Sequence, residues 1–277
     1  MRRLWPRAPA AQPSRPRLPD LLSSSNARLA AARRLTSRTE RRETGRFLAE
    51  GVPAVREALA AGAILELFAT SEAIDRHPEL TGDAAEISAK DAAALSETVT
   101  PQGLVAVCTL AQPTAAEILS RSPRLLVVLV EPNDPGNLGA ILRTADAAGA
   151  DALFVDGGVD PYNGKAVRAS AGSVFHLPIV EFATEDLLAG TDRVGMAALA
   201  TTGYGDADLD DLVDDATLSR PAVWLFGSEA HGLPTAVLEA ADFRVRVPIY
   251  GRAESLNLAA AAAVCLYASA RAQRTGR

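Results

Sequence analysis

The feature that most constrains this chain is a run of six strand-forming residues, Leu125 to Val130, with no polar residue in it. Such a run is typical of a strand buried on both faces, as in a parallel sheet covered by helices. Turn-forming residues follow from Glu131 to Asn137, and a helical pattern then runs from Leu138 to Ala148. A second short strand at 152–155 completes a strand–helix–strand unit. Ligands of such sheets bind at the carboxyl ends of the strands, so chemistry is expected first in the loop after the first strand.

The length and composition indicate a globular protein with ordinary domains. A chain of 277 residues suffices for one large domain or two smaller ones, and 48% of the residues are apolar. No apolar run approaches the roughly 20 residues that span a bilayer. Cys108 and Cys265 lie far apart in apolar contexts and indicate free thiols of a reducing compartment, while the three histidines have no ligand spacing to a cysteine. We therefore expect a cytoplasmic protein without a metal site or membrane segment.

The first twenty residues are rich in proline, alanine and arginine. No apolar segment follows that would complete a secretory signal. We predict a flexible tail over 1–20, and an over-extended translation start is the alternative.

A small α/β domain is predicted over residues 21–110, because short strands and helices alternate there. Its first helix is expected to begin after the capping residues Ser23 to Asn26. The other expected elements are strands near 47–51, 64–69, 84–88 and 104–108, with helices at 53–61 and 90–98. A linker over 111–124, with a helix at 115–121, leads into a second domain at 125–277.

Arginine is concentrated at the start of the first domain, with seven in the nineteen residues from Arg28 to Arg46. The net charge of −6 does not favour nucleic acid, but a local patch decides binding. Spacings of four and five place several of these arginines on one face of a helix. A charge run is usually a solvated surface, yet on an acidic protein this one favours contact with RNA phosphates. The candidate RNA-binding residues are Arg28, Arg34, Arg38 and Arg42.

The second domain continues the alternation of strand and helix. Expected strands lie at 177–180, 194–200, 222–226 and 243–249, with helices at 166–170 and 185–189. The acidic segment 206–215 could bind a cation, but an exposed helix or loop away from any substrate is favoured. A final alanine-rich helix, from Leu256 to about Arg271, is expected in the core or in a dimer interface.

Three loops of the second domain place Gly, Asn, Ser and Glu directly after buried strands, at 133–143, 227–234 and 247–257. Each loop alone is a weak signal, because these residues are ordinary turn formers. Neither the dinucleotide-binding pattern G-x-G-x-x-G nor the P-loop pattern is present. Standard dinucleotide and nucleoside triphosphate sites are therefore disfavoured.

In this order, the three loops resemble the SpoU (TrmH-type) branch of the SPOUT superfamily of RNA methyltransferases. The resemblance rests on Asn137 to Ala145, on Phe226 to Leu233, and on Val247 to Ile249 followed by Glu254 to Ala259. It covers 125–277 densely, and 26–62 also resembles the family's N-terminal RNA-substrate-binding module. It implies a small N-terminal α/β substrate-binding domain and a C-terminal SPOUT α/β domain with a deep trefoil knot. Sequence physics alone would not propose a knot, since knots are rare.

The activity implied by the resemblance is methyl transfer from S-adenosylmethionine to a ribose 2'-hydroxyl of RNA by a homodimer. Ribosomal RNA, most of all 23S ribosomal RNA, is the favoured substrate, because the domain organisation looks like that of thiostrepton-resistance-type enzymes. Transfer RNA is the alternative. Cofactor contacts carry over to Gly227, Val247, Ile249 and Leu256, where backbone groups would hold the adenine and glycine permits a close approach.

The catalytic residues implied by the resemblance are Arg143, Asn137, Glu229, Ser255 and Asn257. A ribose hydroxyl is a poor nucleophile and needs help in losing its proton. The pKa of a free guanidinium exceeds about 12, so Arg143 would stabilise the developing alkoxide, or act as a base only when a phosphate or the cofactor perturbs it. Asn137 would orient Arg143 or cap the helix. Glu229 would hold the second loop or contact the substrate or a partner subunit.

Two interpretations from other classes stay open at this point. A catalytically silent RNA-binding protein of the same fold would be expected to have lost Arg143, Asn137 or Glu229, and all three are present. A nucleotide-binding α/β enzyme of another class would need a phosphate-binding loop, which the sequence lacks.

Overall fold

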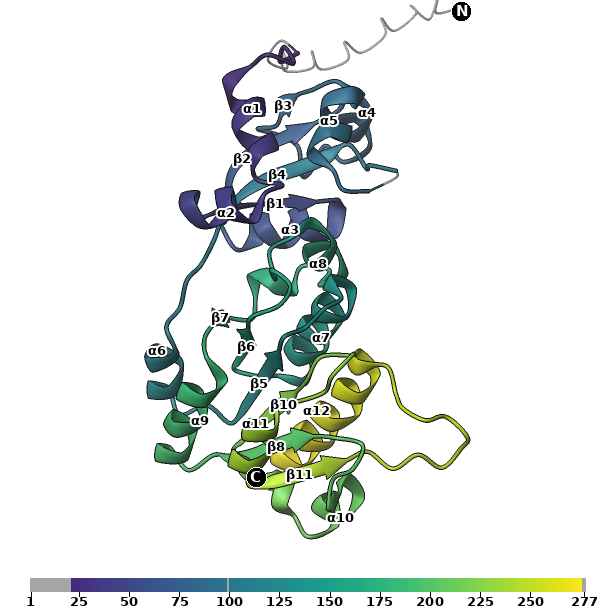
Figure 1. Ribbon diagram of the computed structural model, residues 1–277. Coiled ribbons are helices and arrows are strands. Elements are labelled where there is room, and N and C mark those ends of the chain that lie inside the picture. Colours follow the sequence, from purple (N-terminus) through teal and green to yellow (C-terminus); the bar gives the residue numbers. More distant parts are fainter. Residues whose placement is uncertain (1–20, 99, 276–277) are drawn as a thin grey trace, which may run out of the picture.

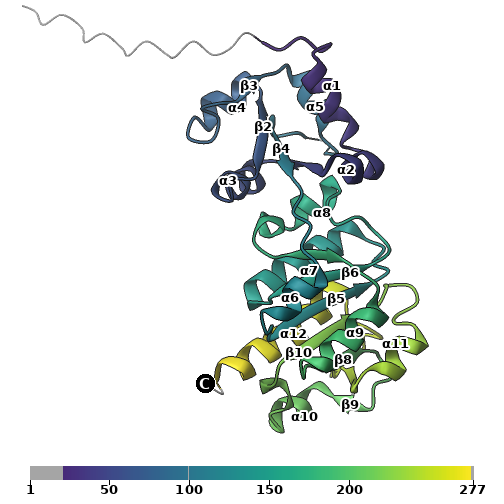
Figure 2. The ribbon, with the colours of Figure 1, turned by 90° about the vertical axis from the view of Figure 1, so that its left-hand side faces the viewer.

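The computed structural model describes residues 21–98 and 100–275, which form two sheets with their own helices (Figure 1). The tail expected over 1–20 lies outside the described residues. The two units stand end to end, with the N-terminal unit above the larger C-terminal one, and the view in Figure 2 shows the same arrangement from the side.

The first sheet has four strands in the order β1-β4-β2-β3. β4 runs antiparallel to β1 and β2, and the short β3 pairs in parallel with β2. The strands are β1 (Arg46–Glu50), β2 (Ile64–Ala69), β3 (Ala85–Glu86) and β4 (Leu104–Thr109). The helices are α1 (Ala27–Arg34), α2 (Arg38–Thr44), α3 (Val52–Ala60), α4 (Ser71–Arg76) and α5 (Ala89–Leu95).

Local signals predicted most of these elements, with two exceptions. Asn26 caps α1 and Ser88 caps α5, each accepting a backbone N–H of the first turn, as expected of such residues. The arginine-rich segment, however, forms two helices and not one continuous face. The chain breaks at Leu35, which is buried, and restarts with Ser37 at the N-cap of α2. The sequence analysis also missed α4, which is only six residues long and too short to show a periodic pattern.

The second sheet has seven strands, all parallel, in the order β7-β6-β5-β10-β8-β11-β9. The strands are β5 (Leu125–Val130), β6 (Ala152–Asp156), β7 (Ile179–Glu181), β8 (Ala197–Thr201), β9 (Ala207–Asp208), β10 (Ala222–Phe226) and β11 (Phe243–Arg246). The prediction of a parallel sheet built around Leu125 to Val130 is confirmed. β5 lies between β6 and β10, and every one of its residues is buried.

Alternate residues of β5 enter two separate hydrophobic cores. Leu125, Val127 and Leu129 pack with α7 (Pro135–Ala148) and α12 (Leu258–Thr275) on one face of the sheet. Leu126, Val128 and Val130 pack on the other face with α6 (Ala115–Ser120), α9 (Thr184–Arg193) and α11 (Thr235–Ala240). The strand is apolar throughout because both of its faces are covered.

The remaining helices are α8 (Gly164–Ala169), the 3₁₀ turns η1 (Ser173–Phe175) and η2 (Thr217–Ser219), and α10 (Leu209–Asp214). The acidic segment 206–215 forms β9 and α10. Asp206 and Asp208 pair with Arg244 and Arg246 of the neighbouring strand β11, at 2.7 and 3.2 Å. Asp206 and Asp208 therefore balance the charges of two arginines on β11, the strand next to the edge strand β9.

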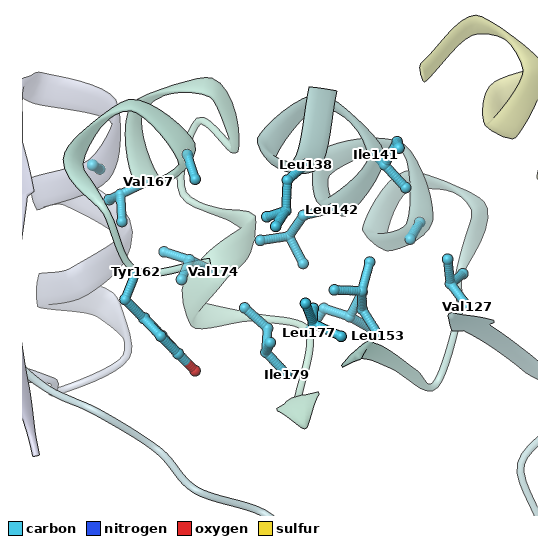
Figure 3. Close-up of a cluster of buried hydrophobic side chains, with 14 of the residues drawn as sticks. Val127, Leu138, Ile141, Leu142, Leu153, Tyr162, Val167, Val174, Leu177 and Ile179 are labelled. Carbon is cyan, nitrogen blue, oxygen red and sulfur yellow. The ribbon is translucent and has the colours of Figure 1, made fainter. Parts of the chain in front are cut away.

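Hydrophobic packing joins the two units. The ring of Phe47 in β1 lies 5.0 Å from that of Tyr162 and 5.6 Å from that of Phe175, centroid to centroid. Figure 3 shows Tyr162 beside the cluster formed by Val174, Ile179 and the side chains of α7 and α8. One continuous core thus runs from the first sheet to the second.

Several boundaries in the second unit differ from the sequence expectation, among them the start of β8 at Ala197 and three that border the loops at 133–143 and 247–257. α7 begins at Pro135, three residues early, because Asp134 and not a later residue caps it. β11 ends at Arg246, and α12 begins at Leu258, so that 247–257 forms a long loop that projects away from the sheet in Figure 1. The trefoil knot stays a prediction, since strand order records neighbours and not threading. None of the helices in the described ranges is long and apolar enough to cross a membrane.

A buried hydrogen bond between β10 and α12 gives a test of this packing. The Trp224 indole N–H donates to the Ser269 hydroxyl at 2.8 Å, and both residues are fully buried. We expect Ser269→Ala to lower the free energy of unfolding by about 1–3 kcal/mol, because the indole N–H loses its acceptor. In the Trp224→Phe background the same change is expected to cost clearly less.

Urea unfolding of the four proteins of this double-mutant cycle measures the coupling. Ser120→Ala, at the exposed end of α6, is the control and is expected to change stability by less than about 0.5 kcal/mol. Equal costs of Ser269→Ala in the two backgrounds would contradict the coupling.

Candidate functional site

The carboxyl ends of all seven strands lie at one edge of the second sheet, because the strands are parallel. The loops after β5, β10 and β11 therefore converge there, and these are the three loops singled out by the sequence. The site is built from the contacts between them.

The first loop is held at the start of α7. Asp134 accepts the backbone N–H of Asn137 at 2.8 Å and pairs with the Lys165 ammonium at 2.8 Å. The hydrogen bond from Lys165, together with that from Asn137, lowers the pKa of Asp134. Asn137 is thus the third residue of the helix and not its cap, and its amide is free for other contacts.

The Asn137 side chain links all three loops. Its Nδ2 donates to Glu229 Oε1 of the second loop at 2.8 Å, and its Oδ1 accepts from Asn257 Nδ2 of the third loop at 3.1 Å. The backbone N–H of Asn133 donates to the other oxygen of Glu229 at 3.2 Å. These hydrogen-bond directions agree with one another. An ionised carboxylate can only accept, so the Asn137 amide must turn its NH₂ group towards Glu229 and its oxygen towards Asn257.

Glu229 stays ionised in this network. Its partial burial by itself would raise the pKa, but hydrogen bonds from the Asn137 amide and from backbone N–H groups outweigh that effect and lower the pKa. The carboxylate is therefore a fixed negative group between the first and second loops at neutral pH.

The second loop folds back on itself directly after β10. Ser228 and Gly232 exchange two backbone hydrogen bonds, of 3.2 and 2.9 Å. A Cβ at Gly227 would lie 2.1 Å from the carbonyl carbon of Gly232, closer than any side chain allows. This turn needs a glycine at 227, because the backbone of Gly232 lies where a side chain would begin.

The third loop is exposed along most of its length. Val247 is partly buried against the core, whereas Ile249 and Leu256 are exposed by 39% and 40%. Asn257 ends the loop and caps α12, since its Oδ1 accepts the N–H groups of Ala259 and Ala260. Ser255 is exposed and has no hydrogen-bond partner within 21–98 and 100–275.

Arg143 lies apart from this network. Its side chain is exposed on α7 and makes no hydrogen bond or ion pair with any residue in the described part of the chain. Six residues of helix separate it from Asn137, which amounts to about 9 Å of rise and about 120° of rotation. No hydrogen bond joins Asn137 to Arg143, so the expected orienting contact is not present in a single chain.

The four candidate RNA-binding arginines do not form one basic face. Arg28 pairs with Glu66 at 3.2 Å and Arg34 with Glu40 at 2.9 Å, both on the surface of the first unit. Arg38 and Arg42 instead reach the second unit, where both pair with Glu181. Each arginine has an acidic partner, and for Arg28, Arg38 and Arg42 sequence spacing could not reveal it because the partner is distant in the chain.

Two participants of the site were not named from the sequence, the Asn133 backbone N–H and the Asp134 cap. Both lie in the loop that the sequence marked as the first place for chemistry, and the turn-forming residues there were the available signal. In the described ranges, no group of three or more His, Cys, Asp and Glu side chains is placed to hold a metal ion.

Comparisons with known proteins match both units. The profile of the SpoU rRNA methylase family matches residues 124–267, and that of the MRM3-like substrate binding domain matches residues 26–106. The chain is 34% identical over 248 residues to the 23S rRNA (guanosine(2553)-2'-O)-methyltransferase RlmP of Bacillus subtilis, covering 88% of this chain and 96% of that protein.

Two solved structures are similar over nearly the whole chain. An AdoMet-bound rRNA methyltransferase from Sinorhizobium meliloti is 33% identical with a TM-score of 0.77, covering 91% of this chain and 97% of the other. The SpoU methyltransferase AviRb from Streptomyces viridochromogenes, in complex with AdoMet, is 31% identical with a TM-score of 0.78, covering 91% and 100%.

The charge of Glu229 can be tested through pH. Because its pKa is lowered from 4.5, the stability it contributes is present above pH 4.5 and is lost as the pH falls through its folded value. We expect Glu229→Gln to lower the free energy of unfolding at pH 7 by about 1 kcal/mol or less, since the side chain is partly exposed. The difference from the wild type is expected to shrink towards pH 3.

Urea unfolding of both proteins at pH 7 and pH 3 measures this. Glu254→Gln changes an exposed carboxylate of the third loop that has no hydrogen-bond partner in the described ranges. This control is expected to be neutral at both pH values. A cost of Glu229→Gln that is the same at pH 3 and pH 7 would argue against an ionised Glu229.

Proposed function

Because the chain belongs to the SpoU rRNA methylase family, we propose that it is an S-adenosylmethionine-dependent methyltransferase of a ribose 2'-hydroxyl in 23S ribosomal RNA. The observation that carries the proposal is the hydrogen-bonded link Glu229–Asn137–Asn257, which joins the three loops at the carboxyl edge of the sheet. RlmP, which aligns with 88% of the chain, and a Streptomyces viridochromogenes relative, which aligns with 64% of it, are both named as 23S ribosomal RNA 2'-O-methyltransferases, which supports this substrate over transfer RNA.

The residues at this edge suit S-adenosylmethionine. Gly227 lets the second loop fold tightly against the end of β10, which places the backbone groups of that loop at the strand end where an adenine would bind. Ile249 and Leu256 add exposed apolar surface for a flat ring, and Val247 anchors their loop on the core. Gly227, Val247, Ile249 and Leu256 are the proposed cofactor contacts. Two similar structures contain AdoMet, which supports this assignment.

Arg143 is the proposed catalytic residue. S-adenosylmethionine supplies a methyl group on a positively charged sulfur, and the ribose oxygen that accepts it must give up a proton. With no acidic partner in the described ranges, the Arg143 guanidinium is available to stabilise the alkoxide that develops. It acts as the base only after giving up its own proton, which the positive charge of the cofactor would favour. Asn137 and Glu229 hold the three loops together, and Ser255 and Asn257 place polar groups beside the reacting ribose.

The exposed apolar residues support a homodimer. Val264 and Tyr267, exposed by 44% and 52%, lie one turn apart on α12 and form an apolar surface that a second copy would cover. The helical rise places Arg143 about 9 Å along α7 from Asn137. We propose that a second copy supplies the groups that complete the site around Arg143. We also propose the trefoil knot of the SPOUT fold for residues 125–277.

We propose that the first unit binds the RNA. The match of residues 26–106 to a substrate-binding domain supports this role, with Arg28, Arg34, Arg38 and Arg42 as candidate phosphate contacts. The boundaries proposed for the two domains are 21–110 and 125–277, joined by a linker at 111–124. A ribosomal RNA substrate also supports a cytoplasmic location.

Replacement of Arg143 tests the reaction. We expect the wild type to transfer label from S-adenosylmethionine to a 2'-oxygen of 23S ribosomal RNA. Arg143→Ala is expected to slow transfer about 10²–10³-fold, because a group that stabilises the developing charge is lost. Cofactor binding, measured by calorimetry, is expected to stay within about twofold of the wild type.

The matched control is Arg193→Ala, an exposed arginine at the end of α9 on the opposite face of the sheet, without a partner in the described ranges. Label in transfer RNA alone would reassign the substrate. Cofactor binding by the wild type without transfer to any RNA would favour the silent RNA-binding interpretation. An absence of cofactor binding would overturn the proposal.

Charge reversal on the first unit tests RNA binding. Arg28 and Arg34 are chosen because their side chains are exposed by 49% and 62% and do not contact the second unit. We expect the double change to glutamate to weaken binding of a 23S fragment and to lower the slope of log Kd against log salt by about 2, one unit per lost phosphate contact. Filter binding between 50 and 200 mM salt, a range typical of such titrations, measures both effects.

Arg76→Glu reverses an exposed arginine on α4 of the same unit and is the matched control. Binding and salt slope equal to those of this control would remove Arg28 and Arg34 from the RNA surface.

A further inference from the structure

The arginines of α2 attach the first unit to one loop of the second. Arg38 donates to the carbonyl oxygen of Gly158 at 2.9 Å, and Arg42 pairs with Glu181 at the end of β7. Arg41 reaches Asp160 with two nitrogens, Nε at 2.9 Å and Nη2 at 2.6 Å. Gly158 and Asp160 belong to the loop 157–163 that follows β6, which we name the relay loop.

The pair of Arg41 and Asp160 is buried and fully hydrogen-bonded. Their side chains are exposed by only 5% and 9%. The third guanidinium nitrogen of Arg41 donates to the carbonyl of Leu35 at 2.7 Å, and the second oxygen of Asp160 accepts the N–H of Tyr162 at 2.8 Å. Buried ion pairs contribute little net stability, because desolvation offsets their attraction, but they specify one geometry. Aromatic packing of Phe47 already joins the two units, so the geometry of the Arg41–Asp160 pair is available for positioning the residues next to it.

The opposite side of the relay loop lies against the first site loop. The Val159 N–H donates to the Pro132 carbonyl at 2.9 Å. Gly158 has a φ of +65°, and a Cβ there would lie 2.5 Å from the same carbonyl oxygen. The next residue, Asn133, donates its backbone N–H to Glu229. A continuous set of contacts therefore runs from α2 through the relay loop to the network of the candidate site.

We propose that Arg41 and Asp160 are a positioning pair for methyl transfer, which sets the place of the first site loop by way of the relay loop. The inference rests on the proposed function and extends it to residues outside the three family loops. Arg41 and Asp160 contact neither the three site loops nor the exposed edge where RNA and cofactor would bind. Their effect is on the alignment of Asn133 and Asn137 with Glu229, and it links the orientation of the RNA-binding unit to that alignment.

The relay can be tested with Asp160→Asn in the full-length protein. The amide keeps an oxygen for the Tyr162 N–H, but its NH₂ faces the Arg41 donors and the ion pair is lost. We expect kcat per cofactor-binding site to fall roughly ten- to hundredfold, as for other small misplacements of reacting groups. The KM for 23S ribosomal RNA and the Kd for S-adenosylmethionine are expected to change less than about twofold.

Asp91→Asn is the matched control. Asp91 is a buried partner of Arg33 within the first unit, it accepts hydrogen bonds from Ser24 and Ser88, and neither it nor Arg33 contacts the second unit. Loss of this pair is expected to lower the melting temperature without changing kcat per cofactor-binding site. A kcat loss equal to that of Asp160→Asn would reduce the role of Asp160 to ordinary stability and overturn the proposal.

Gly158→Ala tests the same set of contacts where the relay loop meets the first site loop. An added methyl group displaces the Pro132 carbonyl without touching the ion pair. We expect the same fall in kcat with the same unchanged KM. In both variants the backbone N–H of Asn133 is expected to exchange with solvent faster than in the wild type, whereas a purely global loss of stability would speed exchange throughout the sheet.

The outcomes separate this inference from the proposed function. A wild type that transfers no methyl group would overturn the function itself. An active wild type whose Asp160→Asn and Gly158→Ala variants keep its kcat, or lose only RNA affinity, would overturn the positioning pair alone.

Discussion

The burial of β5 on both faces is the constraint on which the structure depends. A strand that contributes to two cores must be flanked by strands and covered by helices on both sides, and crossover connections through helices make its neighbours parallel. Parallel strands present their carboxyl ends at one edge. The loops after β5, β10 and β11 are thereby gathered in one place, although about a hundred residues separate the first from the second.

Within that edge, one amide has a central position. Asn137 gives its NH₂ to a carboxylate and its oxygen to another amide, which leaves a single orientation for each group. Hydrogen bonds keep Glu229 ionised despite its partial desolvation, and the network is therefore stable in charge across the neutral range. The rigid part of the site is this network, whereas Arg143 and most of the third loop are exposed.

The arginine-rich segment shows how a charge pattern divides into different roles once the chain is folded. Arg28 and Arg34 lie on the surface, paired with acidic groups that an RNA phosphate could displace at small cost. Arg41 is buried in an ion pair with a residue more than a hundred positions away. The same run of arginines is thus divided between the surface and a buried contact, and only the fold decides which arginine lies where.

The sequence by itself determined most of the strands, the parallel arrangement of the second sheet and the loops to inspect, because apolar runs, caps and turn residues act locally. β2, β5 and β10 have the predicted ends, and Asn26 and Ser88 cap the predicted helices. Only the tertiary structure decided the partners of these residues. It moved the cap of α7 from Asn137 to Asp134, divided the arginine segment into two helices, and paired Arg41 with Asp160. Such contacts join distant positions through packing, and a periodic pattern along one chain carries no information about which distant group will be adjacent.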